Sequence, residues 1–285
     1  MALSTVIAAA LLAAAGAWLA AEFGLRLMGF HRFPLFAADP ECGFRMRGAQ
    51  AGRFRNRVAW SYDEHGGRAP EGVAGPAGAI LIVGDSVVEG GLRIAQDETL
   101  AAQVARLCGA PAYPLACHGW ALANELAALE LLPGWRAARS LVMVINTSDL
   151  DQVGKMASPL SFPTRPPRLL LPWLVRRQLL RSGIYPRGKW VPGPYPHQAL
   201  REQNLARLRA LCTGFAGRVF VAAYPLRGQD LTGEPHFAEL AEASGAELFF
   251  VGASEHWTEA CYSDHIHPNA RGVGALAAII RERCC

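Results

Sequence analysis

The sequence predicts an α/β protein with a mainly parallel five-stranded sheet between helices, preceded by an N-terminal transmembrane helix. Short apolar runs alternate with helical stretches from Ala79 onward, and the runs are apolar on both faces. Strands of this kind are typical of parallel sheets that helices cover on each side. The chain has 285 residues, of which 51% are hydrophobic, so it can bury a full core.

Residues 1–22 are interpreted as a transmembrane anchor. Ala2 to Ala21 carry no charge and contain only Ser4 and Thr5 as polar side chains, which is about the length that a bilayer-spanning helix requires. Two alternatives stay open. A cleaved signal peptide would account for the small residues near position 14, although no Lys or Arg precedes the run. A buried helix fits a wholly uncharged run less well.

Residues 23–75 are expected to form a linker or extension with one β-hairpin. They mix Arg, Gly and Pro with isolated aromatic residues, and they keep neither helical nor strand periodicity for long. Arginines such as Arg26 and Arg32 follow the apolar run directly. By the positive-inside rule, these charges would hold this flank in the cytoplasm.

Residues 76–285 are expected to form one domain in which strands and helices alternate. In a parallel sheet, the functional site lies at the carboxyl ends of the strands. The strands are expected near 79–84, 112–117, 140–146, 218–223 and 247–251, and the helices over 97–108, 121–132, 198–213, 235–244 and 269–283.

A basic insertion occupies about residues 152–200. No Asp or Glu occurs from Gln152 to Arg201. Residues 168–181 can form a short helix that begins near Pro172 and has an apolar and a cationic face. This helix suits a lid over the site or contact with a lipid surface. The alternative is an insertion packed on its own domain with its arginines in water. The basic residues are Lys155, Arg165, Arg168, Arg176, Arg177, Arg181, Arg187, Lys189 and Arg201.

The first expected strand ends at Gly84-Asp85-Ser86, which makes Ser86 a candidate nucleophile. Taken alone, this turn is equally a helix cap. Near the C-terminus, Asp264 and His267 stand three residues apart before Pro268. This spacing lets the carboxylate reach one nitrogen of the imidazole while the other faces outward, which is what an activated hydroxyl needs.

His265 is a second candidate for the base, because it neighbours Asp264. Adjacent residues on an extended loop point away from each other, so His267 is preferred. A capping turn with a solvated histidine is the structural alternative for the whole Asp264–His267 segment.

Together these residues resemble the SGNH, or GDSL, hydrolases. The Gly84-Asp85-Ser86 block is followed by Gly90, and Asp264-His265-Ile266-His267 matches the family's final Asp-x-x-His block. Gly119 stands where the family has a glycine after the second strand. The resemblance covers roughly residues 79 to 283 and implies the flavodoxin-like three-layer sandwich of these enzymes.

The resemblance implies acyl transfer through a covalent intermediate, with Ser86 as nucleophile, His267 as base and Asp264 as its orienting partner. The backbone amides of Ser86 and Gly119 would form the oxyanion hole. The family's third donor is an asparagine, but Ser148 stands in its place within Asn146-Thr147-Ser148-Asp149.

Three interpretations of Ser148 stay open. In the preferred one, its hydroxyl reaches the oxyanion directly or through water. Alternatively, Asn146 donates from two residues upstream, or the enzyme is slow or inert, since one lost donor costs on the order of a hundredfold in rate.

Composition argues against other classes. The net charge of +4 gives little reason to expect a nucleic-acid partner, and the chain has no Gly-rich nucleotide-binding motif. The seven cysteines form no CxxC pair or Cys/His cluster at metal-ligand spacing. They do not fix the redox compartment, and adjacent Cys284 and Cys285 are read as oxidised or frayed. No cofactor and no metal are expected.

The sequence therefore predicts a membrane-anchored, single-pass serine esterase that acts on an acylated glycan or lipid. Two alternatives stay open: an O-acyltransferase on the same fold, and a catalytically weak relative that binds a glycan or a partner protein. The resemblance to envelope enzymes favours a periplasmic domain over the cytoplasmic one that the arginines favour.

Overall fold

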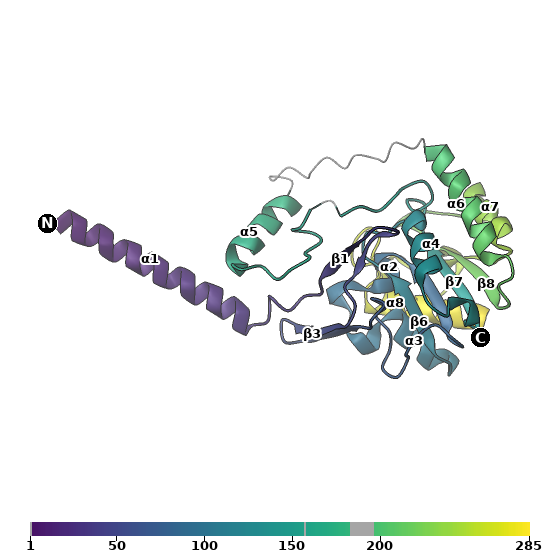
Figure 1. The fold of residues 1–285 in the computed structure, drawn as a ribbon, viewed down its shortest axis with the longest axis horizontal. Coiled ribbons are helices and arrows are strands. Elements are labelled where there is room, and N and C mark those ends of the chain that lie inside the picture. Colours follow the sequence, from purple (N-terminus) through teal and green to yellow (C-terminus); the bar gives the residue numbers. More distant parts are fainter. Residues whose placement is uncertain (1, 157, 183–196) are drawn as a thin grey trace.

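A computed structural model describes residues 2–156, 158–182 and 197–285 of the chain. A long N-terminal helix projects from an α/β domain, and β-hairpins and helix α5 (Leu170–Arg181) lie near the base of that helix (Figure 1). Part of the basic insertion, including Arg187 and Lys189, lies outside the described residues.

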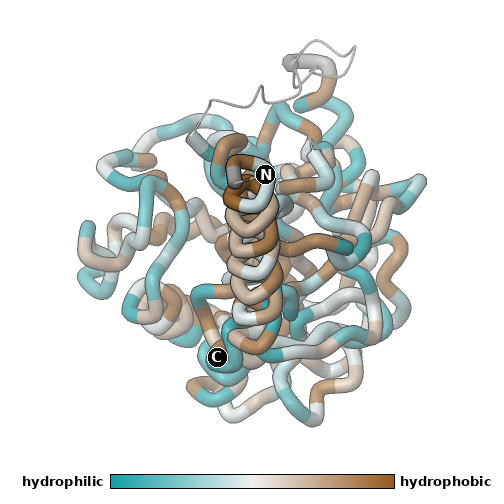
Figure 2. The backbone as a smooth tube through the Cα atoms, turned by 90° about the vertical axis from the view of Figure 1, so that its left-hand side faces the viewer, coloured by the Kyte–Doolittle hydropathy of each residue, from teal (hydrophilic) through white to brown (hydrophobic). Residues whose placement is uncertain are grey.

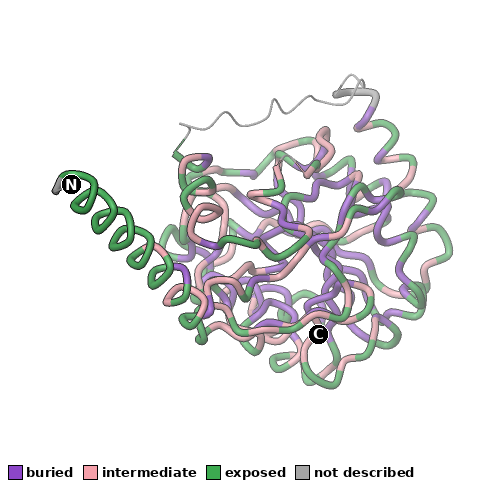
Figure 3. Tube along the Cα trace, turned by 60° about the vertical axis from the view of Figure 1, so that its left-hand side comes forward, coloured by how far each residue is buried: buried purple, intermediate pink, exposed green. Residues whose placement is uncertain are grey.

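Helix α1 spans Ala2–Leu27, and most of its residues are exposed (Figure 3). It is long and apolar enough to cross a membrane. Figure 2 shows that its residues are largely apolar, and Figure 1 shows the helix projecting from the domain. The helix continues past residue 22, where the expected anchor ended. Glu22 and Arg26 form an i,i+4 ion pair of 2.8 Å that supports the last turn.

Two antiparallel hairpins follow α1, where one was expected. The second was missed because its turn carries an arginine in the left-handed region: Arg55 and Asn56 have φ values of 51° and 55°. The Arg57 amide donates to the Phe54 carbonyl at 3.0 Å, which closes a type I′ turn. The strands are β1 (Phe36–Asp39), β2 (Gly43–Met46), β3 (Gln50–Phe54) and β4 (Val58–Tyr62).

The central sheet has five strands, and all hydrogen-bonded neighbours run parallel. The predicted fold class is confirmed, with every strand within a residue or two of its expected bounds. The order β6-β5-β7-β8-β9 is that of a flavodoxin-like sheet. The strands are β5 (Ile80–Gly84), β6 (Ala112–Ala116), β7 (Ser140–Ile145), β8 (Arg218–Ala223) and β9 (Glu247–Phe250).

Helices cover both faces of the sheet and divide the core in two. In β5, Ile80 and Ile82 belong to the core layer that packs under α3 and α8. Leu81 and Val83 belong to the layer under α4, α6 and α7, as the two-residue period of a strand requires. The helices are α2 (Ser86–Glu89), α3 (Leu100–Cys108), α4 (Leu122–Leu131), α6 (His197–Cys212), α7 (Pro235–Ser244) and α8 (Ala270–Cys284).

Helix α5 spans Leu170–Arg181, close to the helix expected from Pro172, and it is joined to the end of α1. The Glu22 carboxylate accepts hydrogen bonds from the amides of Leu170 and Leu171, at 2.8 and 2.7 Å. These amides begin a helix and have no acceptor within it. The contact ties the insertion to the N-terminal helix.

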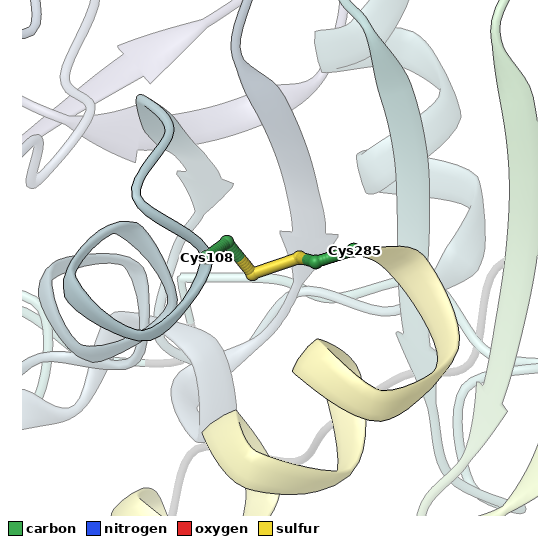
Figure 4. Close-up of a disulfide and its surroundings, with 2 residues drawn as sticks. All are labelled: Cys108 and Cys285. Atoms are coloured by element: carbon green, nitrogen blue, oxygen red, sulfur yellow. A yellow bond between two sulfur atoms is a disulfide. The ribbon is translucent and has the colours of Figure 1, made fainter.

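A disulfide joins Cys108, the last residue of α3, to the C-terminal residue Cys285 (Figure 4). The end of the chain is therefore held against the domain rather than frayed. Cys284 is a free, buried thiol.

Candidate active site

Ser86 lies at the carboxyl end of strand β5, where the strand order reverses and doubly wound sheets place their ligand sites. Asp85 caps the short helix α2 by accepting from the Val87 amide at 2.8 Å. Gly90 ends α2 with a φ of 81°, a conformation that favours glycine. The tight strand–turn–helix places Ser86 in the lining of a cavity.

His267 faces Ser86 from the loop before α8. The Ser86 Oγ lies 2.9 Å from the His267 Nε2, and the His267 Nδ1 lies 2.9 Å from each oxygen of Asp264. An imidazole whose Nδ1–H donates to a carboxylate leaves Nε2 free to accept from a hydroxyl. Ser86, His267 and Asp264 therefore form a continuous chain of hydrogen bonds.

The Asp264–His267 loop also explains why His267 rather than His265 faces the serine. Asp264 Oδ1 accepts from the amides of Ile266 and His267, at 3.1 and 2.8 Å. This compact turn folds the His267 ring back over the carboxylate, whereas His265 is exposed and its carbonyl accepts from the Arg227 amide. Burial raises the pKa of Asp264, but these amides and the imidazole outweigh it and hold the pKa well below its usual range.

Arg93 is a further contact to this carboxylate that the sequence gave no reason to expect. Its Nη1 lies 3.2 Å from Asp264 Oδ2 and 2.8 Å from the Ser263 hydroxyl. Asp264 is thus held on one side by His267 and on the other by a cation.

Gly119 lies in a tight turn after β6, as the sequence placed it. The Trp120 amide donates to the Cys117 carbonyl at 3.1 Å, and Gly119 has a φ of 83°, which a type II turn requires at its third residue. A Cβ at this position would lie 3.1 Å from the Phe162 ring. The turn also presents His118, whose ring lies 6.1 Å from that of His267, centroid to centroid.

His118 lines the same cavity and remains accessible there. Desolvation by the cavity walls lowers the pKa of His118; Glu89 opposes this effect, whereas His267 and two arginines add to it. A neutral imidazole is the favoured form beside the serine. His118 was not predicted from the sequence, because nothing in its spacing links it to the site.

Asn146 and Ser148 lie after β7 and contact each other. The Asn146 Oδ1 accepts from the Ser148 amide at 2.9 Å and also from the Ser148 hydroxyl. Neither residue belongs to the lining of the cavity that contains Ser86, as far as the chain is described. The structure thus places Ser148 next to Asn146, with its hydroxyl already donating.

Three buried carboxyl groups lie behind the nucleophile: Asp85, Glu125 and Asp149. Burial raises the pKa of Asp85 to about 6, and burial together with the neighbouring carboxyls raises the pKa values of Glu125 and Asp149 well above their usual range. Within the described residues, neither oxygen of Glu125 has a hydrogen-bond partner. Each of these carboxyls therefore favours its protonated form more than an exposed carboxyl does.

A cavity of about 670 Å³ opens in front of Ser86 and His267. One part of its wall is apolar and comes from the segment after α1 and the hairpins: Phe30, Phe33, Pro34, Phe36, Met46 and Phe54. The other part is cationic and consists of Arg55, Arg57, Arg93, Arg177 and Arg181. Among the described residues, no three His, Cys, Asp or Glu side chains gather in a way that could hold a metal ion.

No protein-family model and no curated protein matches the sequence. Among solved structures, TesA is similar with 14% identity and a TM-score of 0.43, over 71% of this chain and 95% of that chain. A GDSL-like lipase from Bacteroides thetaiotaomicron has 11% identity and a TM-score of 0.43, over 73% of this chain and 87% of that chain. An acetylxylan esterase, Axe2 from Geobacillus stearothermophilus, has 14% identity and a TM-score of 0.42, over 73% of this chain and 94% of that chain. Because these identities and TM-scores are low, the roles of individual residues rest on this chain's own geometry.

Proposed function

We propose that the chain is a serine hydrolase of the SGNH type that cleaves carboxylic esters. The observation that carries the proposal is the unbroken hydrogen-bond chain from Ser86 through His267 to Asp264. A serine hydroxyl is a weak nucleophile until a base accepts its proton, and the base needs a fixed tautomer. The ordered GDSL-type blocks of the sequence point to the same chemistry.

In the proposed reaction, Ser86 Oγ attacks the ester carbonyl while His267 Nε2 takes the hydroxyl proton. Asp264 holds the imidazole by Nδ1 and stabilises its charge. The tetrahedral intermediate collapses, the alcohol leaves with the proton from His267, and an acyl-serine remains. Water, activated by the same imidazole, then releases the acid. If another hydroxyl takes the acyl group instead, the same site performs O-acyl transfer.

The proposed oxyanion hole consists of the backbone amides of Ser86 and Gly119 together with a side-chain donor. Ser86 is the first residue of α2, so its amide has no acceptor within that helix. Ser148 is proposed as the side-chain donor, but its hydroxyl must first leave Asn146. Asn146 is the competing donor: its Oδ1 accepts from Ser148, and its side-chain amide, which contacts the Asp149 carboxyl, would have to turn toward the oxyanion.

We also infer that α1 anchors the protein in a membrane and that the domain lies on the extracytoplasmic side. The helix is apolar and exposed, and a disulfide between Cys108 and Cys285 suits an oxidising compartment. The arginines after α1 favour the opposite side. Fusion of a reporter that is active in only one compartment, placed after Cys285, distinguishes the two orientations.

Labelling with a fluorophosphonate probe tests the catalytic proposal, because only an activated serine reacts with it. We expect labelling of the full-length protein, loss of the label in Ser86→Ala and His267→Ala, and retained label in Ser254→Ala. Ser254 is a suitable control because its hydroxyl accepts from the His256 backbone amide and not from an imidazole. An unlabelled protein with native circular dichroism would instead favour a non-catalytic binding role.

A further inference from the structure

Helix α5 brings two arginines to the cavity in front of Ser86. Arg177 and Arg181 are one helical turn apart on the same face, and both line the cavity. Arg177 is partly buried, with its guanidinium 5.1 Å from the centre of the Trp173 ring. Trp173 in turn stacks on Phe33 at 4.9 Å. The Arg177 side chain is therefore positioned by an aromatic stack.

Neither arginine has a carboxylate partner among the described residues. The carboxylates of the cavity are engaged elsewhere: Glu89 by the Tyr62 hydroxyl and the Gly91 amide, and Asp264 by His267 and Arg93. The residues outside the described ranges contain no Asp or Glu in the sequence. The chain therefore brings no acidic side chain to these two charges.

Burial, together with the neighbouring Arg181, lowers the pKa of Arg177 to about 10. A partly desolvated cation beside a second cation is unfavourable unless an anion is present. Arg55, stacked over Phe30 at 4.9 Å, and Arg57 add further positive charge to the same cavity. The observations point to an anionic group that comes from outside the chain.

The apolar part of the cavity wall, which adjoins these arginines, indicates what the anion is attached to. Phe30 and Phe33 follow directly on helix α1, and α5 is tied to α1 through Glu22. An aromatic wall next to the end of a membrane-length helix suits an acyl chain better than a polar sugar.

We propose that Arg177 and Arg181 bind the phosphate of an anionic lipid ester, whose acyl chain lies on the aromatic wall and whose carbonyl faces Ser86. Arginine suits this task because its planar guanidinium can bind a phosphate through two parallel hydrogen bonds. This inference rests on the proposed function for the identity of the bond cleaved, but phosphate binding itself does not require catalysis.

The binding test uses full-length Ser86→Ala protein in nanodiscs of neutral phosphatidylcholine, with octyl phosphate and octyl glucoside as probes. We expect octyl phosphate to bind and R177Q/R181Q to weaken it by at least about tenfold, with octyl glucoside unaffected. R176Q is the matched control, since Arg176 is exposed on the same helix and does not line the cavity. Equal affinity for both probes, or an equal loss in R176Q, overturns the proposal.

Competition experiments distinguish the source of the anion. Inorganic phosphate and glucuronate should displace octyl phosphate only at concentrations at least about tenfold higher, because neither can use the aromatic wall. Equal competition by inorganic phosphate would show a free-phosphate site, and equal competition by glucuronate would show an acidic-glycan site. Either result overturns the lipid assignment.

The activity test compares 1-octanoylglycerol 3-phosphate with 1-octanoylglycerol, which differ only in the phosphate. We expect R177Q/R181Q to raise KM for the phosphate ester by at least about tenfold, with little change for the neutral ester. If the natural protein hydrolyses neither ester and is not labelled by the fluorophosphonate, the proposed function fails. Equal kcat/KM for both esters in the labelled, active protein would contradict the arginine site alone.

Discussion

Arg93 donates a hydrogen bond to the carboxylate that orients His267: its Nη1 lies 3.2 Å from Asp264 Oδ2. The contact is largely exposed on the arginine side, and Asp264 keeps its bonds from His267 and from two backbone amides when the arginine is removed. Solvent-exposed ion pairs contribute little, whereas loss of the carboxylate removes the tautomer control of the imidazole.

We therefore expect Arg93→Gln to lower kcat/KM on p-nitrophenyl acetate by less than about fivefold. Asp264→Asn should lower it on the order of a thousandfold or more. The two variants are measured side by side at the same pH. Equal losses would mean that Arg93 contributes as much to the site as the carboxylate does.

A second prediction concerns the pH dependence of stability at Asp85. Burial raises the pKa of this carboxyl to about 6, against about 3.9 in an unfolded chain. The folded state therefore binds the proton more tightly. The contribution of Asp85 to the free energy of unfolding is greatest below about pH 4 and is lost as the pH rises through 6, by about 3 kcal/mol.

Asp85→Asn keeps an acceptor for the Val87 amide but cannot ionise. Urea unfolding should show the variant to be more stable than the natural protein at pH 7, with the difference shrinking at pH 4. A stability difference that is the same at both pH values would contradict the raised pKa. Because the Asp85 charge helps to raise the pKa values of Glu125 and Asp149, the measured difference includes the response of these two carboxyls to its removal.

A third prediction concerns the oxyanion hole. Ser148→Asn should raise kcat for a small acyl ester by about tenfold or more, since an amide reaches farther than a hydroxyl and oxyanion donors are strong contributors. Unchanged or lower kinetics would argue that Ser148 does not line the hole.

Asn146→Asp then serves as the second test, because it keeps the acceptor for the Ser148 amide but removes the amide donor. If Asn146 supplies the donor, kcat falls on the order of a hundredfold.

The disulfide gives a fourth prediction. Of the seven cysteines, five should react with a thiol reagent in denatured, unreduced protein, and all seven after reduction. Cys285→Ser should lower the free energy of unfolding by about 2–4 kcal/mol. The natural protein measured in reductant is the matched control and should have the stability of the variant. Seven reactive thiols without reduction would exclude the bond.

The sequence predicted the central sheet well because each strand is a short apolar run buried on both faces, as in Ile80–Gly84. The hairpins were harder, since the turn at Arg55 and Asn56 uses positive φ values that the residue type arginine does not signal. Local spacing also separated His267 from His265, because the turn that folds one ring back is formed within four residues.

Contacts between distant segments could not be predicted. Arg93 meets Asp264 across 171 positions of the chain, and nothing in either local sequence marks the pair. For α5, the spacing of its arginines predicts a cationic face. It does not predict which of these arginines line the cavity. That depends on the bond between Glu22 and the start of the helix. The Asn146–Ser148 contact likewise requires the folded loop.

The disulfide places some of the candidate site residues inside a covalent ring and leaves Ser86 outside it. Residues 108–285 form a covalent ring when Cys108 and Cys285 are joined, and His267, Asp264 and Gly119 lie inside it, whereas Ser86 lies on the open arm that continues to α1. A single proteolytic cut within the ring leaves both fragments attached to the same molecule. The serine and its histidine then stay covalently linked until the disulfide is reduced, so the half-life of the nicked protein reports the redox state of its surroundings.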